Sequence, residues 1–441
     1  MKSSRLEELV APAQEQNMFR QGCSDDTSRG NVCVRAAILT GGIDKPYVLG
    51  LSQALVLKGV EIEVAGNDEM DVPEMHASPL LRFLDLYGDQ RSKRSRAGKL
   101  VRIVVVYIRL MLYSANARPQ IFHVLWNYRF DFWDRTFLML YYKLLGKSVV
   151  MTAHNVNAAE RDGKDSSLNR WTLGVQYRLM DHIFVHTEKM KQELIGDFRV
   201  KEESISVIPF GVNDTAPKTE LSRKDARRLL GLGESEKVIL CFGRIKPYKG
   251  IEYLVEAFQR IVLSDIGYRL VIAGEPNKES AQYWNKIQRA IGSGVASEKI
   301  IQNIRHIPDE KTEIYFKAAD VLVLPYTHVF QSGVLFLAYS FGLPVIATSV
   351  GSLNEGIKVG ETGYICEAQD SADLARTIEK YFASDLYRDL ENRRSSIRAF
   401  ALERNSWSVV GDITRNVYTA LLGRGHKIGH RPDNSEATQS S

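Results

Sequence analysis

A basic loop in the second half of the chain has the clearest chemical pattern. Residues 241–258 (CFGRIKPYKGIEYLVEAF) contain an apolar run, then Gly243, Arg244, Lys246 and Lys249, and then a run with helical spacing. Backbone N–H groups at a helix start carry partial positive charge, and an arginine can hold two phosphate oxygens. The loop therefore suits a diphosphate without a metal ion. A solvated basic turn would have the same pattern, and spacing alone does not separate the two interpretations.

Two other segments bring candidate groups to the ends of predicted strands. His154 follows residues 148–153, and Gly41 and Gly42 follow residues 34–40. A histidine at a strand end can enter a cleft, or it can be a structural residue whose hydrogen bonds are satisfied. Two glycines allow close approach of the backbone to a ligand, or they make a tight turn before a helix. Both alternatives stay open for each segment.

These segments belong to an alternation of strands and helices that occurs twice. Apolar or alternating runs predict strands at 34–40, 60–65, 121–125, 148–153, 183–186 and 205–209, and again at 238–242, 269–273, 301–306, 321–324 and 345–347. Strands that alternate with helices predict an α/β fold with two Rossmann-like, doubly wound domains that face a cleft. Ligands in such sheets bind outside the carboxyl ends of the strands, so the function is expected in that cleft.

The domain boundaries follow from the same pattern. A polar stretch after residue 210 separates the two repeats, and a long helical stretch near the end could cross back to the first domain. The predicted division is a disordered N-terminus (1–30), a first Rossmann-like domain (31–210), a second one (211–395), a helix packing towards the first domain (396–422) and a disordered tail (423–441).

Composition excludes several classes of protein. With 441 residues, 44% hydrophobic and 25% charged, the chain is an ordinary globular protein of more than one domain. A net charge of +5 does not indicate nucleic-acid binding. Four scattered cysteines suit a reducing cytoplasm rather than a disulfide framework. No signal peptide and no apolar run of roughly 18 residues is present, which predicts a cytoplasmic protein without a membrane span.

The basic loop and several other segments of the chain resemble the motifs of one enzyme family. The Gly243-Arg244 and Lys249-Gly250 pairs resemble the Gly-Arg…Lys-Gly motif of family 4 glycosyltransferases, which have the GT-B fold. Segments similar to other donor-domain motifs of that family follow in order: 270–275 (LVIAGE), 319–326 (ADVLVLPY), 342–348 (GLPVIAT) and 351–357 (GSLNEGI). In the first half, Gly41-Gly42 resembles the glycine loop of the family, and residues 149–155 (VVMTAHN) resemble its strand-then-histidine motif.

The resemblance implies a retaining glycosyltransferase that moves a sugar from a nucleoside diphosphate to a lipid-linked or polysaccharide acceptor. It implies that Arg244 and Lys249 neutralise the leaving diphosphate and that His154 contacts the transferred sugar. The glycines assigned to the donor site are Gly41, Gly42, Gly243 and Gly274. No Asp-x-Asp occurs in the chain, so we expect neither a metal ion nor another cofactor.

The family pattern breaks at one place. Two glutamates eight positions apart normally precede the Gly-x-Pro motif, but Val329 and Leu337 stand there. This difference keeps open the alternative of a catalytically silent, nucleotide-sugar-binding or scaffolding subunit. A dehydrogenase is disfavoured because the turn after residues 34–40 lacks Gly-x-Gly-x-x-Gly.

The segment between those two positions resembles a variant loop found in some polysaccharide-assembly members. Gln331, Ser332, Gly333 and Val334 are therefore assigned to the donor site. Ser332 and Gly333 can open a helix and offer N–H groups to a phosphate. Glu355 is assigned to the far side of the same site, with a helix-start carboxylate as the alternative.

A basic and an apolar segment adjoin in the first domain. Residues 91–102 hold six basic side chains and no acidic one, and residues 103–113 are apolar with one arginine. Such a pair can lie on an anionic membrane surface, which would make the protein peripheral at the inner face of the membrane. A solvated loop before a core helix is the alternative. The aromatic residues of 125–133 (LWNYRFDFW) could stack on an acceptor sugar or pack in the core.

Overall fold

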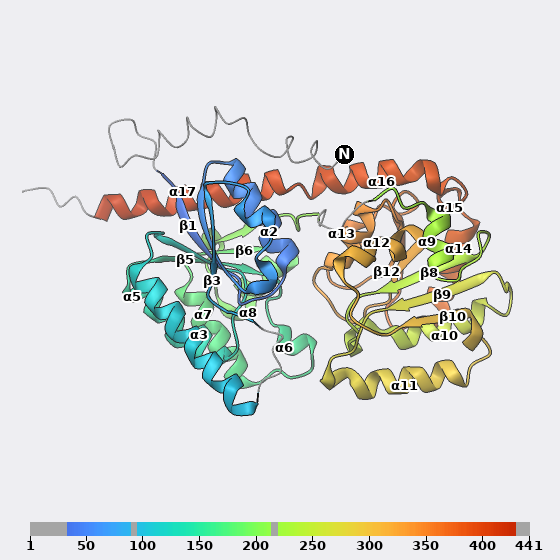
Figure 1. Cartoon of the computed structure of the whole chain (residues 1–441). Helices are drawn as coiled ribbons and strands as arrows, with labels where there is room; N and C mark the ends of the chain where they lie inside the picture. The colour runs from blue at the N-terminus through green and yellow to red at the C-terminus, as the bar shows by residue number, and fades with distance from the viewer. Residues whose placement is uncertain (1–32, 90–94, 213–218, 429–441) are drawn as a thin grey trace, which may run out of the picture.

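The computed structural model describes residues 33–89, 95–212 and 219–428. Within these ranges the chain forms two parallel sheets, each covered by helices on both faces, which lie side by side as two lobes (Figure 1). The predicted α/β fold with two Rossmann-like domains is confirmed. The predicted disordered N-terminus (1–30) lies outside the described residues.

The N-terminal domain has a seven-stranded parallel sheet in the order β3-β2-β1-β4-β5-β6-β7. Its strands are β1 (Arg35–Leu39), β2 (Glu61–Gly66), β3 (Leu81–Asp85), β4 (Ile121–Val124), β5 (Ser148–Ala153), β6 (His182–Val185) and β7 (Ile205–Val207). Its helices are α2 (Lys45–Leu57), α3 (Arg96–Asn116), α4 (Asp131–Trp133), α5 (Met139–Leu144), α6 (Ala158–Arg161), α7 (Ser167–Leu179) and α8 (Glu188–Phe198), with the single turns η2 (Asp68–Met70), η3 (Pro73–His76), η4 (Asp134–Leu138) and η5 (Glu202–Ser204). The inner strands are buried on both faces, as helices on both sides require.

The C-terminal domain has a six-stranded parallel sheet in the order β10-β9-β8-β11-β12-β13. Its strands are β8 (Lys237–Phe242), β9 (Tyr268–Ala273), β10 (Ile300–Asn303), β11 (Val321–Leu324), β12 (Val345–Thr348) and β13 (Gly363–Cys366). Its helices are α9 (Arg223–Leu229), α10 (Ile251–Ile261), α11 (Ala281–Gly292), α12 (Asp309–Ala318), α13 (Gly333–Ser340), α14 (Ser371–Ala383) and α15 (Asp385–Arg388), with the turns η6 (Pro247–Lys249), η7 (Lys278–Ser280), η8 (Ser297–Lys299) and η9 (Asn354–Gly356).

Strand order reverses once in each sheet. The reversal lies between β1 and β4 in the first sheet and between β8 and β11 in the second. In open parallel sheets the loops at such a reversal diverge to opposite faces and leave a crevice at the carboxyl ends of the strands. The glycine turn after β1 and the basic loop after β8 both start at a reversal. The topology therefore brings both predicted motifs to ligand-binding edges.

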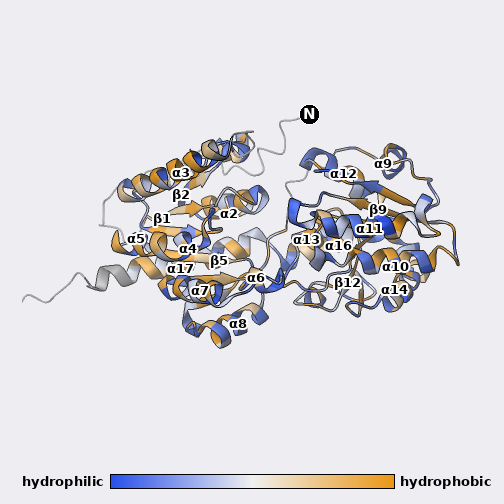
Figure 2. Cartoon of the chain, turned by 90° about the horizontal axis from the view of Figure 1, so that it is seen from below, coloured by the Kyte–Doolittle hydropathy of each residue, from blue (hydrophilic) through white to orange (hydrophobic). Residues whose placement is uncertain are grey.

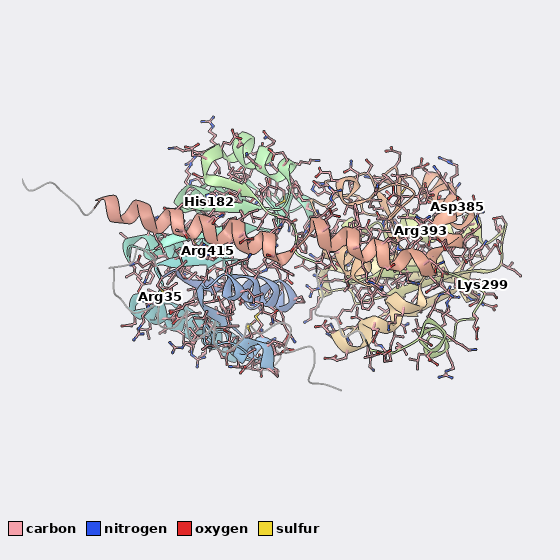
Figure 3. The ribbon with its side chains drawn as sticks, turned by 90° about the horizontal axis from the view of Figure 1, so that it is seen from above. Arg35, His182, Lys299, Asp385, Arg393 and Arg415 are labelled. Atoms are coloured by element: carbon pink, nitrogen blue, oxygen red, sulfur yellow. The ribbon has the colours of Figure 1, made fainter. Side chains whose placement is uncertain are left out.

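Two C-terminal helices connect the domains. Helix α16 (Leu390–Arg404) packs on the C-terminal domain, and α17 (Trp407–Ile428) packs on the N-terminal domain. Figure 3 shows Arg393 of α16 over the C-terminal domain and Arg415 of α17 over the N-terminal domain. Helix α17 is held by a buried contact of 2.6 Å between Tyr418 Oη and His123 Nδ1. The predicted return to the first domain is confirmed, but the predicted single helix (396–422) is two. Residues 423–428 of the predicted disordered tail (423–441) belong to α17, and the rest of that tail lies outside the described residues.

Two cysteines lie in the core of the C-terminal domain. Cys241 and Cys366 are free and buried there.

Trp407 fills the junction between the domains. Its indole Nε1 donates a hydrogen bond of 3.0 Å to the carbonyl oxygen of Val212. A Cβ atom added at Gly50 of α2, or at Gly211, would lie 2.2 Å from the indole ring. Real Cβ atoms essentially never come so close to another atom. Trp407 therefore fits into the junction because Gly50 and Gly211 have no side chain.

Substitution of Gly50 tests this packing. We expect Gly50→Ala to lower the free energy of unfolding by about 1–3 kcal/mol, because the new methyl group overpacks the junction. The matched control is Gly174→Ala in α7, where an added Cβ meets no atom within 4 Å. It should raise stability by about 0.5–1 kcal/mol, since alanine favours a helix. Urea denaturation measures both, and equal midpoints for the two variants would contradict the assigned role of Gly50.

Candidate functional site

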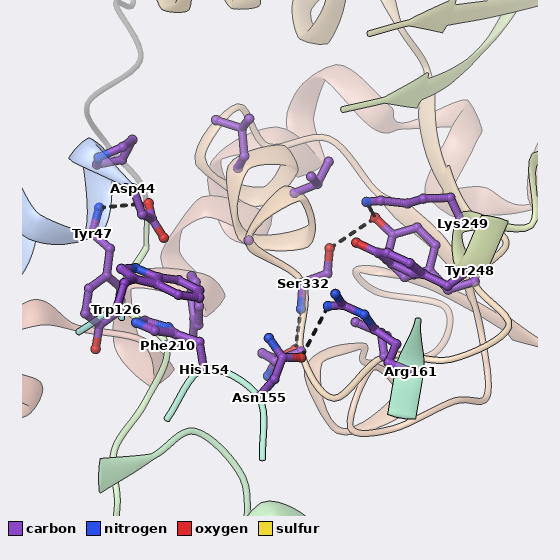
Figure 4. Close-up of a pocket in the computed structure, with 18 of the residues that line it drawn as sticks. Asp44, Tyr47, Trp126, His154, Asn155, Arg161, Phe210, Tyr248, Lys249 and Ser332 are labelled. Carbon is purple, nitrogen blue, oxygen red and sulfur yellow. Dashed lines mark hydrogen bonds between the residues drawn. The ribbon is translucent and has the colours of Figure 1, made fainter. Parts of the chain in front are cut away.

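A cavity of about 330 Å³ lies between the two domains. Figure 4 shows Tyr47, Trp126 and His154 of the N-terminal domain on the opposite side from Tyr248 and Lys249, while Arg161 of the N-terminal domain reaches across to Tyr248. The residues that line it are Asp44, Pro46, Tyr47, Trp126, His154, Asn155, Arg161, Phe210, Gly211, Tyr248, Lys249, Tyr326, Val329, Gln331, Ser332, Gly333, Val334, Leu337 and Trp407. Most of them follow the carboxyl ends of strands, as the strand-order reversals predict.

The predicted site residues divide into two groups. Those that line the cavity are His154, Lys249, Gln331, Ser332, Gly333 and Val334. Those that do not line it are Gly41, Gly42, Gly243, Arg244, Gly274 and Glu355. Arg244 is exposed in the loop after β8, and Glu355 is exposed in the turn η9. The structure thus brings together six of the predicted residues from both domains.

The glycines outside the cavity shape the loops around it. Gly243 (φ 109°) and Gly274 (φ 144°) follow neighbouring strands, and a Cβ atom at Gly274 would lie 2.0 Å from the carbonyl oxygen of Gly243. Gly250 (φ 61°) precedes α10, and a Cβ atom there would lie 2.0 Å from the carbonyl oxygen of Pro325. Only glycine combines these backbone angles with such close approach. These residues therefore position Lys249 by backbone packing.

Lys249 is buried and faces the cavity. Its ammonium donates a hydrogen bond to the hydroxyl of Tyr326 and lies 4.1 Å from the centre of that ring. Among the described residues no carboxylate pairs with it. Burial lowers the pKa of Lys249, and the positive charge of Arg161 lowers it further. An anion in the cavity would supply the missing counter-charge and favour the protonated lysine.

Helix α13 adds a second source of positive potential. Its first residues line the cavity, and Ser332 before it makes no side-chain cap. The hydroxyl of Ser332 lies 3.3 Å from that of Tyr326, which also contacts Lys249. N–H groups in the first turn of a helix are unpaired within the helix and attract anions. The lysine and the helix start together make this part of the cavity an anion site.

His154 lies on the opposite wall of the cavity. Its ring stacks on Trp126 with centroids 4.4 Å apart, and its Nδ1 lies 3.1 Å from Nε2 of His186. Its Nε2 is buried and has no hydrogen-bond partner among the described residues. Burial, with the nearby His186, lowers the pKa of His154 well below 6.5, so the ring is neutral at pH 7. The free nitrogen is suited to a hydroxyl group of a bound ligand.

Carboxylates are scarce in this cavity. Val329 and Leu337, at the positions where the family carries glutamates, both line it. Asp44 is the one carboxylate among its described lining residues. Asp44 has a positive φ of 60° and caps α2 by accepting from the Tyr47 N–H. Burial raises the pKa of Asp44. The balance of charge in the cavity therefore favours an anion.

A second interdomain cavity, of about 470 Å³, has the opposite character. Glu160, Glu193 and Asp197 line it, together with Lys189 and His328. Burial and the charges of Asp197 and Glu160 raise the pKa of Glu193 to about 7. A phosphate would be repelled by these carboxylates. The smaller cavity around Lys249 is thus the one suited to a phosphorylated ligand.

Sequence reasoning did not identify Asp44 or Arg161 as site residues. Arg161 extends from the end of α6 to the ring of Tyr248 in the other domain, with its guanidinium carbon 4.5 Å from the ring centre. Asp44 shares its turn with the predicted Gly41 and Gly42. The sequence contained two features that could have drawn attention to them: Arg161 comes shortly after the histidine motif, and Asp44 shortly after the glycine pair. Neither signal shows which side chains reach the cleft.

Two family models match the chain. The model described as Glycosyltransferase Family 4 matches residues 45–216, and the one described as Glycosyl transferases group 1 matches residues 236–384. The D-inositol 3-phosphate glycosyltransferase of Pseudarthrobacter chlorophenolicus is 29% identical over 65% of this chain and 68% of its own length. Other curated relatives of that name align over 52–64% of their own length. The chain thus spans about half to two thirds of these relatives.

Solved structures share the fold at low sequence identity. Sucrose-phosphate synthase from Thermosynechococcus elongatus has a TM-score of 0.66 and 19% identity, and the match covers 89% of this chain and all of that one. Anabaena Alr3699/HepE in complex with UDP and glucose has a TM-score of 0.68 and 13% identity, over 88% of this chain and all of that one. Both neighbours show the two-domain arrangement that is described above.

The buried histidines predict an acid-sensitive fold. Burial lowers the pKa of His186 to about 4 and that of His123 to about 3, and it lowers the pKa of His154 as well. Because unfolded histidines titrate near pH 6.5, the unfolded chain binds protons first. Stability should therefore be complete above about pH 6.5 and decline as the pH falls towards 4, by up to about 1.4 kcal/mol per pH unit for each histidine.

Comparison with a variant isolates this effect from that of other titrating groups. His186→Asn removes one of these protonation sites, so its stability should fall less steeply than that of the parent between pH 6.5 and 4. Urea midpoints measured across this range provide the test. Identical slopes for parent and variant would show that the folded-state pKa of His186 is not lowered.

Proposed function

Because the chain belongs to the family 4 glycosyltransferases with the GT-B fold, we propose that it transfers a sugar from a nucleoside diphosphate to an acceptor hydroxyl. The observation that carries this proposal is the buried Lys249, which faces the interdomain cavity without a carboxylate partner among the described residues. A diphosphate leaving group is the anion that such a site would stabilise. The glucose and UDP named for the HepE complex support a nucleoside diphosphate hexose as the donor class.

The proposed reaction needs no protein nucleophile. Negative charge develops on the diphosphate as its bond to the anomeric carbon breaks, and Lys249 and the start of α13 are placed to stabilise it. Arg244, exposed in the same loop as Lys249, is proposed to join them when the donor is bound. The acceptor attacks the same face and gives its proton to the leaving diphosphate, so the configuration is retained. His154 would hold a sugar hydroxyl through its free Nε2.

The cations of the chain replace a metal ion in this proposal. Loss of one preorganised charge donor commonly costs about 3 kcal/mol in the transition state, or roughly 100-fold in rate. Lys249 and Arg244 would each supply an interaction of this kind. We therefore propose a metal-independent transfer.

Donor binding provides the direct test. UDP-, GDP-, ADP- and dTDP-sugars at about 100 times their dissociation constant should stabilise the fold by about 2.7 kcal/mol, which thermal unfolding detects. We expect one nucleotide class to stabilise the parent, with no effect of EDTA. Lys249→Gln should abolish the shift and slow release of the nucleoside diphosphate by about 100-fold or more. Lys224→Ala is the matched control, because Lys224 pairs with Glu234 on the surface of the same domain.

A second candidate function is favoured by one observation. Val329 and Leu337 put apolar side chains into the cavity where the family carries glutamates. A silent nucleotide-sugar-binding or scaffolding subunit would tolerate that change. A parent protein that melts cooperatively but responds to none of the donors, or that binds a donor without ever releasing its sugar, would favour this second candidate.

We also propose that the acceptor is lipid-linked or a growing polysaccharide and that the N-terminal domain lies on an anionic membrane. Helix α3 exposes an apolar stripe of Leu100, Val101, Val104, Val105, Ile108 and Leu112. Lys99, Arg102 and Arg109 accompany it on the same helix. Figure 2 shows α3 as a largely hydrophobic helix at the outer edge of the N-terminal domain. Arg91, Lys93 and Arg94 of the predicted basic segment lie outside the described residues.

Aromatic side chains extend this surface. Phe130, Phe132 and Trp133 of the predicted aromatic segment are 40–48% exposed, and Phe137 and Trp171 are exposed as well. Trp133 lies beside Tyr107 of α3, with ring centroids 6.5 Å apart. Exposed aromatic rings next to an apolar helix suit the interface of a bilayer. None of the described helices combines the length and the apolar composition of a membrane span. The association that we propose is peripheral.

Vesicle sedimentation tests the membrane proposal. The parent should sediment with phosphatidylglycerol-containing vesicles and far less with phosphatidylcholine alone, because the cationic side chains need an anionic surface. Val101→Glu/Ile108→Glu should weaken binding by at least about tenfold, since two apolar contacts are replaced by negative charge. Leu263→Glu/Ile266→Glu alters two apolar residues of the C-terminal domain that are exposed as well, and it should have no effect. Equal sedimentation of both double variants would refute the proposed surface.

A further inference from the structure

Arg161 connects the two domains at the cavity. It ends the short helix α6 that follows the His154 loop, and it lies against the ring of Tyr248 across the interdomain space (Figure 4). Its side chain is only 12% exposed. Burial of an arginine over an aromatic face restricts its movement and partly compensates its lost hydration. The guanidinium is therefore held in place at the wall of the cavity.

The hydrogen bonds of Arg161 leave part of its donor capacity unused. Its Nε and Nη2 donate to the carboxylate of Asp162 at 2.8 and 3.1 Å, and its Nη1 donates to the side-chain oxygen of Asn155 at 3.4 Å. A guanidinium has five N–H donors, so two remain. One of these N–H groups is on Nη1 and the other on Nη2, and together they can donate two parallel hydrogen bonds to one phosphate group.

Arg161 and Lys249 face the same cavity from opposite domains. Both line it, and burial together with the positive charge of Arg161 lowers the pKa of Lys249. Asp44 is the one carboxylate among the described residues that line the cavity. The nearby Asp162 is already paired with Arg161, and its carboxylate also lies 3.4 Å from the ammonium of Lys246. Two cations that repel each other across a cavity are both stabilised by an anion placed between them.

We propose that Arg161 and Lys249 bind one phosphate group between them, so that the phosphate site is complete only when both domains contribute. This inference rests on the proposed glycosyl transfer for its biological meaning. The phosphate belongs either to the donor diphosphate or to a phosphorylated acceptor, and both present the same chemistry to the guanidinium. In either case, phosphate binding favours the closed arrangement of the domains, because neither cation alone completes the site.

Calorimetry on the full-length protein tests the proposal. The first probe is inorganic pyrophosphate. The second is the nucleoside diphosphate of whichever sugar donor stabilises the protein, and the matching nucleoside without phosphate is measured beside it. The third is D-inositol 3-phosphate, added in the presence of that nucleoside diphosphate. Arg161→Ala should weaken binding of at least one phosphorylated probe by about tenfold or more, without changing nucleoside binding. Arg161→Lys should restore part of the loss, because it keeps the charge without the planar fork. Arg170→Ala is the control. It removes ion pairs with Glu160 and Asp165 beside α6, but Arg170 does not line the cavity around Lys249, so this variant should bind the probes as the parent does.

The outcomes separate the two phosphate sources and the two proposals. Weakened nucleoside diphosphate binding assigns the site to the donor, whereas weakened D-inositol 3-phosphate binding alone assigns it to the acceptor. If Arg161→Ala binds all phosphorylated probes as tightly as the parent, the inference is overturned and glycosyl transfer is unaffected. If the parent binds pyrophosphate through Arg161 but no nucleoside diphosphate, the phosphate site stands and the proposed donor fails. A parent that binds none of the probes overturns both.

Discussion

A positive charge held out of water is the constraint on which the site depends. The ammonium of Lys249 is buried without a carboxylate partner among the described residues, which costs free energy in the empty protein. Tyr326 offsets part of that cost through a hydrogen bond and the face of its ring. Gly250 and Gly274 let the surrounding loops pack closely enough to exclude water. The ammonium of Lys249 is already in place when an anion enters the cavity, so no side chain has to move to stabilise it. Such preorganisation is the condition for strong electrostatic stabilisation.

The connections between the domains are packed at one place and polar at another. The chain crosses between domains at residues 210–212 and 405–407, and the two crossings are bonded to each other, since the Val212 N–H donates to the Asn405 carbonyl oxygen at 3.1 Å. Trp407 packs into this junction. Elsewhere the domains also meet through ion pairs, such as that of Lys164 with Glu279. A packed pivot and breakable polar contacts allow the cleft to open without losing its alignment.

Particular residues show what the sequence could and could not predict. Alternating strands and helices predicted both domains, and the Gly-Arg…Lys-Gly spacing predicted Lys249 at a strand end. The edge strands β3 and β13 were missed: two of the five residues of β3 (LRFLD) are charged, and β13 (GYIC) is only four residues long. Arg161 was missed because its role depends on how closely the second domain approaches, which no local pattern encodes. Gly274 illustrates a third case: its conformation matters, but through contact with Gly243 rather than with a ligand.

The apolar positions Val329 and Leu337 change what the cavity can discriminate. A site that hydrogen-bonds a hydroxyl through a carboxylate rejects substrates without that hydroxyl strongly, because the acid would be left unpaired. An apolar wall rejects an extra or missing hydroxyl only weakly. In the proposed donor site, polar selection is left to Gln331, Ser332 and the N–H groups of α13. Discrimination should therefore depend on the phosphate-bearing part of the proposed donor more than on the pattern of sugar hydroxyls.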